Sequence, residues 1–230
     1  MIKGVIFDFD GLIFDTETHE YRLLQELFTE HNSELPLALW QKEIGTHTGF
    51  SPFVYLEEKT QKKLDLPTIE KTFKEKFSSK LAEETARPGV EDYLKTAKSL
   101  NLKIGLASSS NYEWVSTHLK RLGLFHYFDC IKTSDDVEHV KPDPSLYLEA
   151  AHCLQLKPSE CMAFEDSAHG AQAAKTAGMR CVIFPNEVTN AMQFCEVDHR
   201  LDSMLAMPLI ELINKIKYKL TESALFYLLQ

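Results

Sequence analysis

The chain has few positive charges and no long hydrophobic run, and both shortages narrow its possible roles. Its 230 residues include 25 Lys and Arg against 34 Asp and Glu, which gives a net charge of −9. Such an acidic chain is poorly suited to bind nucleic acid by neutralising many phosphates. No apolar run approaches the roughly 20 residues that a membrane-spanning helix needs. We therefore expect no nucleic-acid partner and no membrane partner.

Cysteines are also sparse, and their spacing forms no C-x-x-C pair. The five are Cys130, Cys153, Cys161, Cys181 and Cys195. An odd, scattered set is typical of a reducing compartment, where most thiols are buried and unpaired. Residues 1–4 run directly into a strand pattern, so we expect no signal peptide. These features predict a cytoplasmic protein.

Short apolar runs alternate with helical patterns through much of the chain. Strand patterns cover residues 103–108, 161–166 and 181–184, and helical patterns cover residues 112–122 and 167–178. This alternation is typical of βα units and predicts an α/β fold, with a mostly parallel sheet flanked by helices.

Residues 16–86 interrupt this alternation with helical patterns alone, and strands are expected again only after the turn signal at residues 87–89. The sequence therefore predicts a core made of residues 1–15 and 87–230 and a helical insertion over residues 16–86. An insertion at this point would lie over the carboxyl edge of the sheet, as a lid does. A last helix is expected over residues 208–219. For residues 220–230, a docking segment, a partner contact and a disordered appendage all stay open.

The first predicted strand, residues 5–7, ends in two aspartates, Asp8 and Asp10. Strand side chains alternate, so the two carboxylates should point to one side and Phe9 to the other. Carboxylates that close repel each other unless a proton or a cation intervenes, and Mg²⁺ prefers such oxygen ligands. An EF-hand would require Glu where this chain has His19. A plain turn is the remaining alternative.

Polar residues follow three further strand patterns. Residues 108–111 offer hydroxyls and backbone amides before a helix, which suits phosphate binding. Lys141 lies between apolar residues and prolines, and Glu165 and Asp166 end another strand. Each residue alone has an ordinary reading, as a helix cap, a solvated surface charge or a partner for a helix dipole. Their repeated position after apolar strands predicts one shared site.

In order and spacing, these motifs resemble the haloacid dehalogenase superfamily of phosphatases and phosphomutases. The matching stretches are DFDGLIFDTE (8–17), LASSSN (106–111), KPDP (141–144) and FEDS (164–167). They cover the core from end to end, and the subgroup they most resemble is β-phosphoglucomutase-like and phosphoglycolate-phosphatase-like. The resemblance implies a Rossmann-like core with a helical cap inserted after the first motif.

The resemblance also implies a division of roles. Asp8 becomes the nucleophile that forms an aspartyl phosphate, and Asp10 becomes the general acid and base. The implied phosphate and substrate binders are Ser108, Ser109, Asn111 and the catalytic Lys141. The implied Mg²⁺ ligands are Asp8, Asp166 and the backbone carbonyl of Asp10, with Glu165 as a further candidate.

The predicted cap favours a phosphatase over a mutase. In the resembling mutases, a histidine early in the first cap helix and an arginine in a cap loop take part, whereas this chain has Glu20 at the first position and no Arg or Lys in residues 43–52. A second phosphate would therefore lack a cationic partner. We expect a monomeric Mg²⁺-dependent phosphatase for a small phosphorylated metabolite, with a sugar phosphomutase or a non-catalytic regulator as alternatives. Binding alone would not require Asp10. The expected cap-side contacts are Glu17, His47, Phe14, Phe50 and Tyr55.

Overall fold

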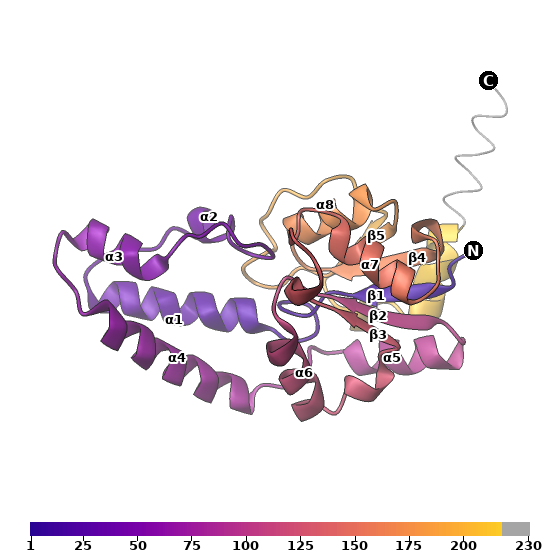
Figure 1. Ribbon diagram of the computed structural model, residues 1–230, viewed down its shortest axis with the longest axis horizontal. Coiled ribbons are helices and arrows are strands. Elements are labelled where there is room, and N and C mark those ends of the chain that lie inside the picture. The colour runs from indigo at the N-terminus through magenta and orange to yellow at the C-terminus, as the bar shows by residue number, and fades with distance from the viewer. Residues whose placement is uncertain (218–230) are drawn as a thin grey trace, which may run out of the picture.

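A parallel sheet forms the centre of the computed structural model, which describes residues 1–217 (Figure 1). Within these residues the strands are β1 (Gly4–Phe7), β2 (Lys103–Ala107), β3 (Cys130–Lys132), β4 (Cys161–Glu165), β5 (Arg180–Ile183) and β6 (His199–Arg200). Their order is β3-β2-β1-β4-β5-β6, and all neighbours pair in parallel. The carboxyl ends of β1, β2 and β4 therefore lie side by side, where parallel sheets bind ligands.

Helices cover both faces of the sheet, which explains the near-continuous apolar runs of its strands. β1 shows the principle: Val5 and Phe7 pack into the core on one face, and Ile6 packs into the core on the other. The first face is covered by α5 (Val90–Ser99), α6 (Tyr112–Arg121) and a helix over residues 209–217. The second face is covered by α7 (Ser145–Cys153) and α8 (Ala168–Thr176). The predicted α/β architecture is confirmed.

A second group of helices extends from the carboxyl edge of the sheet (Figure 1). This helical lobe consists of α1 (Thr16–Glu30), α2 (Leu37–Trp40), α3 (Pro52–Thr60), α4 (Leu66–Glu83) and their loops. It has a hydrophobic cluster of its own, around Leu24, Phe28 and Leu56. Phe14 and Ala86 form a β-bridge where the chain leaves the core and returns to it.

Some elements differ from the sequence expectation. The turn at residues 87–89 leads into α5, a helix that the sequence patterns did not indicate and that precedes the expected strand β2. It forms because Val90, Tyr93, Leu94 and Ala97 give it one buried face at helical spacing. Within the expected helical insertion, α3 occupies Pro52–Thr60, and Ser51 caps its start. The expected helix 208–219 is present over residues 209–217, and residues 218–230 lie outside the described part of the chain. Within that part, no helix has the length and apolarity needed to cross a bilayer.

Candidate active site

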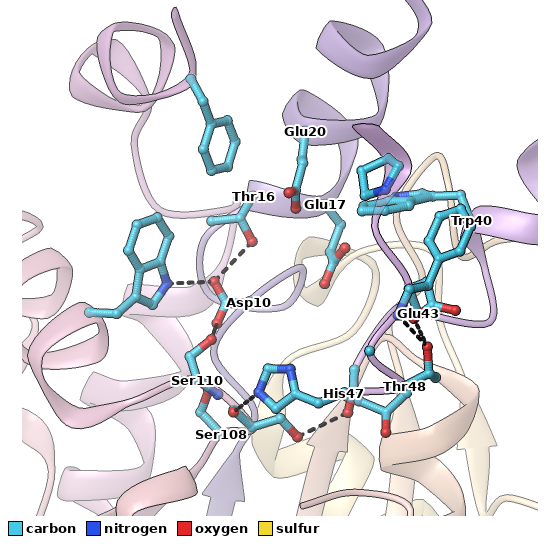
Figure 2. Close-up of a pocket in the computed structure, with 18 of the residues that line it drawn as sticks. Asp10, Thr16, Glu17, Glu20, Trp40, Glu43, His47, Thr48, Ser108 and Ser110 are labelled. Carbon is cyan, nitrogen blue, oxygen red and sulfur yellow. Dashed lines mark hydrogen bonds between the residues drawn. The ribbon is translucent and has the colours of Figure 1, made fainter. Parts of the chain in front are cut away.

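A cavity of about 540 Å³ lies between the carboxyl edge of the sheet and the helical lobe (Figure 2). We call its two sides the sheet wall and the lobe wall. The sheet wall comprises Asp8, Asp10, Ser108, Ser109, Ser110 and Trp114. The lobe wall includes Glu17, Glu20, Trp40, Glu43, His47, Phe50 and Phe77. Sequence motifs separated by about 100 residues thus meet at one cavity.

The buried ammonium group of Lys141 links the two acidic motifs, which lie at the ends of β1 and β4. Lys141 Nζ donates hydrogen bonds to Asp8 Oδ1 and, at 2.7 Å, to Glu165 Oε1. Lys141 is only 1% exposed, and such a buried charge requires pairing of this kind. Although burial alone lowers the pKa of Lys141, the charges of Asp8 and Glu165 raise it above its ordinary value. The side chain therefore stays positively charged beside Asp8.

Glu165 acts mainly as the partner of this lysine. Its Oε1 also accepts a hydrogen bond from the Tyr147 hydroxyl at 2.5 Å, and its Oε2 accepts one from Ser167 Oγ at 3.2 Å. Although Glu165 can share a metal cluster with Asp8 and Asp166, both of its oxygens already have protein partners. The geometry therefore supports Glu165 more strongly as the partner of Lys141 than as the predicted metal ligand.

Asp166 differs from Glu165 because one of its carboxylate oxygens has no hydrogen-bond partner within residues 1–217. Its Oδ2 accepts a hydrogen bond from Asn186 Nδ2 at 2.8 Å, whereas its buried Oδ1 has no hydrogen-bond partner among residues 1–217. Ligand atoms of Asp8, Glu165 and Asp166 lie within 4.8 Å of one another. An unpaired buried carboxylate oxygen beside a second carboxylate fits a hard divalent cation such as Mg²⁺.

The electrostatics of this cluster also favour a cation. Burial raises the pKa of Asp8 to about 8, with Lys141 opposing the rise and Glu165 and Asp10 adding to it. Burial, followed by the charges of Asp8 and Glu165, likewise raises the pKa of Asp166 well above its ordinary value. A bound cation would stabilise the ionised carboxylates, and Asp8 must be ionised to act as a nucleophile.

Asp10 points into the cavity and is held by three donors. Thr16 Oγ1 and Trp114 Nε1 both donate to Oδ1, at 3.0 and 2.9 Å, and Ser110 Oγ donates to Oδ2 at 2.6 Å (Figure 2). Sequence reasoning missed Thr16 and Trp114. Thr16 lies inside the first motif (8–17), so its place in that motif could have identified it as a site residue. Trp114 follows from no sequence pattern, because only the packing of α6 brings it to Asp10.

The other predicted substrate contacts divide into two groups. Ser108 and Ser109 line the sheet wall, and His47 Nε2 donates to the Ser109 carbonyl at 2.8 Å across the cavity. Asn111 is not among the lining residues: its side chain accepts from Trp114 N at 2.9 Å and caps α6. Of the expected cap-side aromatics, Phe50 lines the cavity. Phe14 is fully buried in the core, and Tyr55 packs against Phe28 and Phe50.

The lobe wall is acidic and aromatic. Figure 2 shows Glu17 and Glu20 projecting from α1 toward Asp10. Both are half-buried. Burial by the surrounding wall, helped by nearby carboxylates, raises the pKa of Glu17 well above its ordinary value and that of Glu20 to about 7. Among the described residues that line the cavity, none is Lys or Arg.

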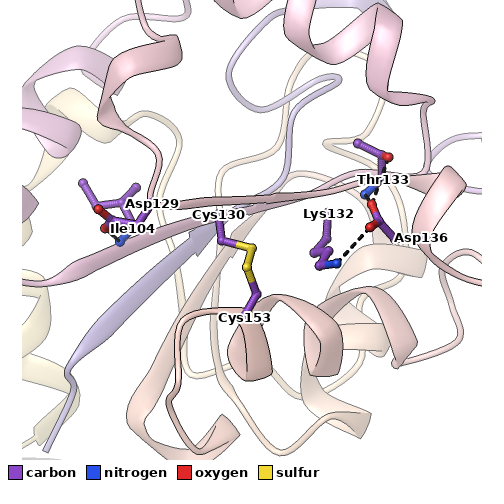
Figure 3. Close-up of a disulfide and its surroundings, with 7 residues drawn as sticks. All are labelled: Ile104, Asp129, Cys130, Lys132, Thr133, Asp136 and Cys153. Atoms are coloured by element: carbon purple, nitrogen blue, oxygen red, sulfur yellow. Dashed lines mark hydrogen bonds and ion pairs between the residues drawn. A yellow bond between two sulfur atoms is a disulfide. The ribbon is translucent and has the colours of Figure 1, made fainter.

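A disulfide joins β3 to α7, the helix that follows the loop containing Lys141. Cys130 in β3 is joined to Cys153 at the end of α7, the helix that also carries Tyr147 (Figure 3). The expectation of unpaired thiols is therefore wrong for these two residues, because α7 packs on β3 and brings together cysteines 23 positions apart. Cys161 and Cys181 are buried free thiols, as expected, and Cys195 is a half-buried one.

Comparisons with known proteins agree with this geometry. Residues 5–184 match the family model described as haloacid dehalogenase-like hydrolase. The chain is 58% identical over 216 residues to the Bacillus subtilis protein named "Putative phosphatase YhcW", covering 94% of this chain and 98% of that protein. It is 33% identical over 190 residues to the β-phosphoglucomutase of the same organism, covering 79% and 82%. A crystal structure of a CbbY mutant from Rhodobacter sphaeroides with xylulose-(1,5)bisphosphate matches with a TM-score of 0.69 and 27% identity, covering 89% and 95%.

Proposed function

Because the chain belongs to the haloacid dehalogenase-like hydrolases, we propose that it is a Mg²⁺-dependent phosphatase for a small phosphorylated metabolite. The 58% identity to a protein named as a phosphatase supports hydrolysis as the reaction. The observation that carries the proposal is the joint position of Asp8, paired with buried Lys141, and Asp10, held by three donors, at one cavity. This joint position supports Asp8 as the nucleophile and Asp10 as the proton donor.

The residues divide the reaction as follows. Asp8 attacks phosphorus and forms an aspartyl phosphate while the bond to the leaving oxygen breaks. Asp10 gives its proton to that oxygen, then takes a proton from the water that hydrolyses the intermediate. Lys141 and Ser108 stabilise the phosphoryl oxygens as their charge spreads. Glu165 and Tyr147 keep Lys141 in position.

The metal part of the proposal rests on the carboxylates beside Asp8. Asp8 and the unpaired Oδ1 of Asp166 would hold Mg²⁺, together with the backbone carbonyl of Asp10. When bound, the ion supplies positive charge that offsets the repulsion between Asp8 and the phosphate.

The lobe wall favours a particular substrate class, namely the monophosphate of a neutral, hydroxyl-bearing compound. A second phosphate or a carboxylate would face Glu17, Glu20 and Glu43 without a cation to pair with. Hydroxyl groups, in contrast, can bond with these carboxyl groups, and the rings of Trp40 and Phe50 can cover apolar faces of a sugar. The similarity to β-phosphoglucomutase keeps a sugar phosphomutase as the second candidate.

Three further features belong to the proposal. The segment 16–86 acts as a cap over the cavity, since it supplies the whole lobe wall. The protein works as a monomer, because one chain provides every residue of the site. A cytoplasmic location also belongs to the proposal and rests on the three free thiols, although the Cys130–Cys153 disulfide is unusual for a reducing compartment.

A panel of phosphate esters tests the function. Sugar and polyol monophosphates, a sugar bisphosphate, phosphoglycolate and β-glucose 1-phosphate are each incubated with enzyme and Mg²⁺. We expect phosphate release from neutral monophosphates, abolished by EDTA and by Asp8→Asn. Lack of release from every ester would refute the phosphatase. Formation of glucose 6-phosphate with little free phosphate would identify a mutase instead.

A further inference from the structure

We propose that Trp114 is a positioning residue for Asp10, and that Phe77 of the helical lobe braces it. The role of Asp10 as proton donor would then depend on a contact between lobe and core. This inference rests on the proposed function, because it requires Asp10 to protonate a leaving group.

The first support is the hydrogen bond itself. Trp114 Nε1 lies 2.9 Å from Asp10 Oδ1, an oxygen that Thr16 Oγ1 also contacts at 3.0 Å. A hydroxyl can donate or accept, but the indole N–H can only donate. Trp114 therefore keeps Oδ1 as an acceptor. The proton that Asp10 passes to the leaving oxygen is then carried by Oδ2. In that protonated form the Ser110 hydroxyl, 2.6 Å away, accepts from Oδ2 instead of donating to it.

The second support is the way in which the indole ring is held. Trp114 stacks on Phe77 of α4, with ring centroids 6.3 Å apart and planes inclined by 13°. The ring of His118 also contacts the indole of Trp114, edge-on and with ring centroids 4.3 Å apart. Two aromatic neighbours fix the plane of the indole and with it the direction of the N–H bond. One of them, Phe77, belongs to the lobe, and both Phe77 and Trp114 line the cavity.

The chemistry of the leaving group makes this role measurable. A sugar alkoxide is a poor leaving group and needs the proton of Asp10, whereas p-nitrophenolate leaves without one. An enzyme with a misdirected Asp10 should therefore lose activity mainly on sugar phosphates. The ratio kcat/KM reports only the steps through leaving-group release, so the later hydrolysis of the aspartyl phosphate does not mask the effect.

Two variants separate the hydrogen bond from the brace. Trp114→Phe keeps a ring against Phe77 but removes the N–H, and Phe77→Leu keeps the N–H but removes the stacking. Each is assayed with Mg²⁺ on a sugar monophosphate from the panel and on p-nitrophenyl phosphate. For Trp114→Phe we expect kcat/KM to fall about 10- to 100-fold on the sugar phosphate and less than about 3-fold on p-nitrophenyl phosphate. Phe77→Leu should show the same split at smaller size.

Two controls give the result its meaning. Asp10→Asn shows the full leaving-group effect, and Tyr112→Phe, on an exposed position of α6, should leave both substrates unaffected. An equal loss on both substrates in Trp114→Phe, beside a clear split in Asp10→Asn, would overturn the inference and leave the phosphatase intact. A wild-type enzyme inactive on all esters would instead refute the function. If Trp114→Phe does not fold, a missing split in Phe77→Leu overturns the inference by itself.

Discussion

The two walls of the cavity are built by different means. On the sheet wall and just beneath it, charged groups are buried and paired: Lys141 joins Asp8 to Glu165, and each side chain is less than a tenth exposed. On the lobe wall, Glu17 and Glu20 are half-buried acids among aromatic rings. Burial and pairing fix reacting groups in place, whereas half-exposed groups can adjust to a ligand. The difference suggests that the sheet wall carries the chemistry and the lobe wall selects the substrate.

The largest effect is expected from removing the buried cation beneath the sheet wall, Lys141, because this tests directly whether buried pairing fixes the reacting groups. Lys141→Met leaves Asp8 and Glu165 side by side without the cation that pairs with both of them. We expect a loss of roughly 3–5 kcal/mol in the free energy of unfolding, because one partner of a buried pair has gone, and a fall in kcat of about 100-fold or more. Urea unfolding and steady-state kinetics measure both. Lys59→Met, on the exposed lobe surface, is the matched control and should change neither. A stable Lys141→Met enzyme would contradict the buried-pair account.

The sheet wall was largely predictable from sequence because its signals are local. Asp8, Ser108 and Asp166 each follow a short apolar strand, so the amino-acid order alone places them at one edge of a sheet. That expectation required only that the strands run parallel. The parallel sheet is present, and the cavity does gather Asp8, Asp10 and Ser108.

The supporting contacts were not predictable in this way, because tertiary packing sets them. Tyr147 reaches Glu165 from α7, and Asn186 reaches Asp166 from a loop after β5. Neither residue belongs to one of the four motifs. β3 and β6, with three and two residues, are too short to show a periodic pattern. Likewise, nothing in the spacing of Cys130 and Cys153 indicates that a helix packed on a strand edge will join them.

A change of charge on the lobe wall tests its role in selection. Glu20→Arg places a cation where the chain has an acid, and a second phosphate would then have a partner. We expect the ratio of kcat/KM for a sugar bisphosphate over a monophosphate to rise about 10-fold or more, since hydrogen bonds to charged groups are strong.

Glu20→Gln is the matched neutral variant, and it should move this ratio by a smaller factor because it removes repulsion without adding attraction. The same ratio in wild type and in Glu20→Arg would show that the substrate does not extend to this wall.

The smallest expected effect is a pH dependence of the free energy of unfolding that arises from Glu20 on the lobe wall. The folded protein raises the pKa of Glu20 from its ordinary 4.5 to about 7, mainly by burial. Between these values the folded state holds a proton that the unfolded chain has released, so the contribution of Glu20 to stability falls as pH rises. Glu20→Gln cannot ionise. It should match wild type near pH 4 and exceed it at pH 8 by on the order of 1–2 kcal/mol, allowing for partial exposure.

Urea unfolding at both pH values, with EDTA and then with Mg²⁺, measures this difference. Because Mg²⁺ would act on Asp8 and Asp166, it should relieve the burial penalty of the sheet wall and leave the advantage of Glu20→Gln at pH 8 in place. Glu58→Gln, at an exposed position of α3, should follow wild type throughout. If Mg²⁺ instead erased the advantage, Glu20 would share the electrostatics of the metal cluster, and the division between a reacting wall and a selecting wall would fail.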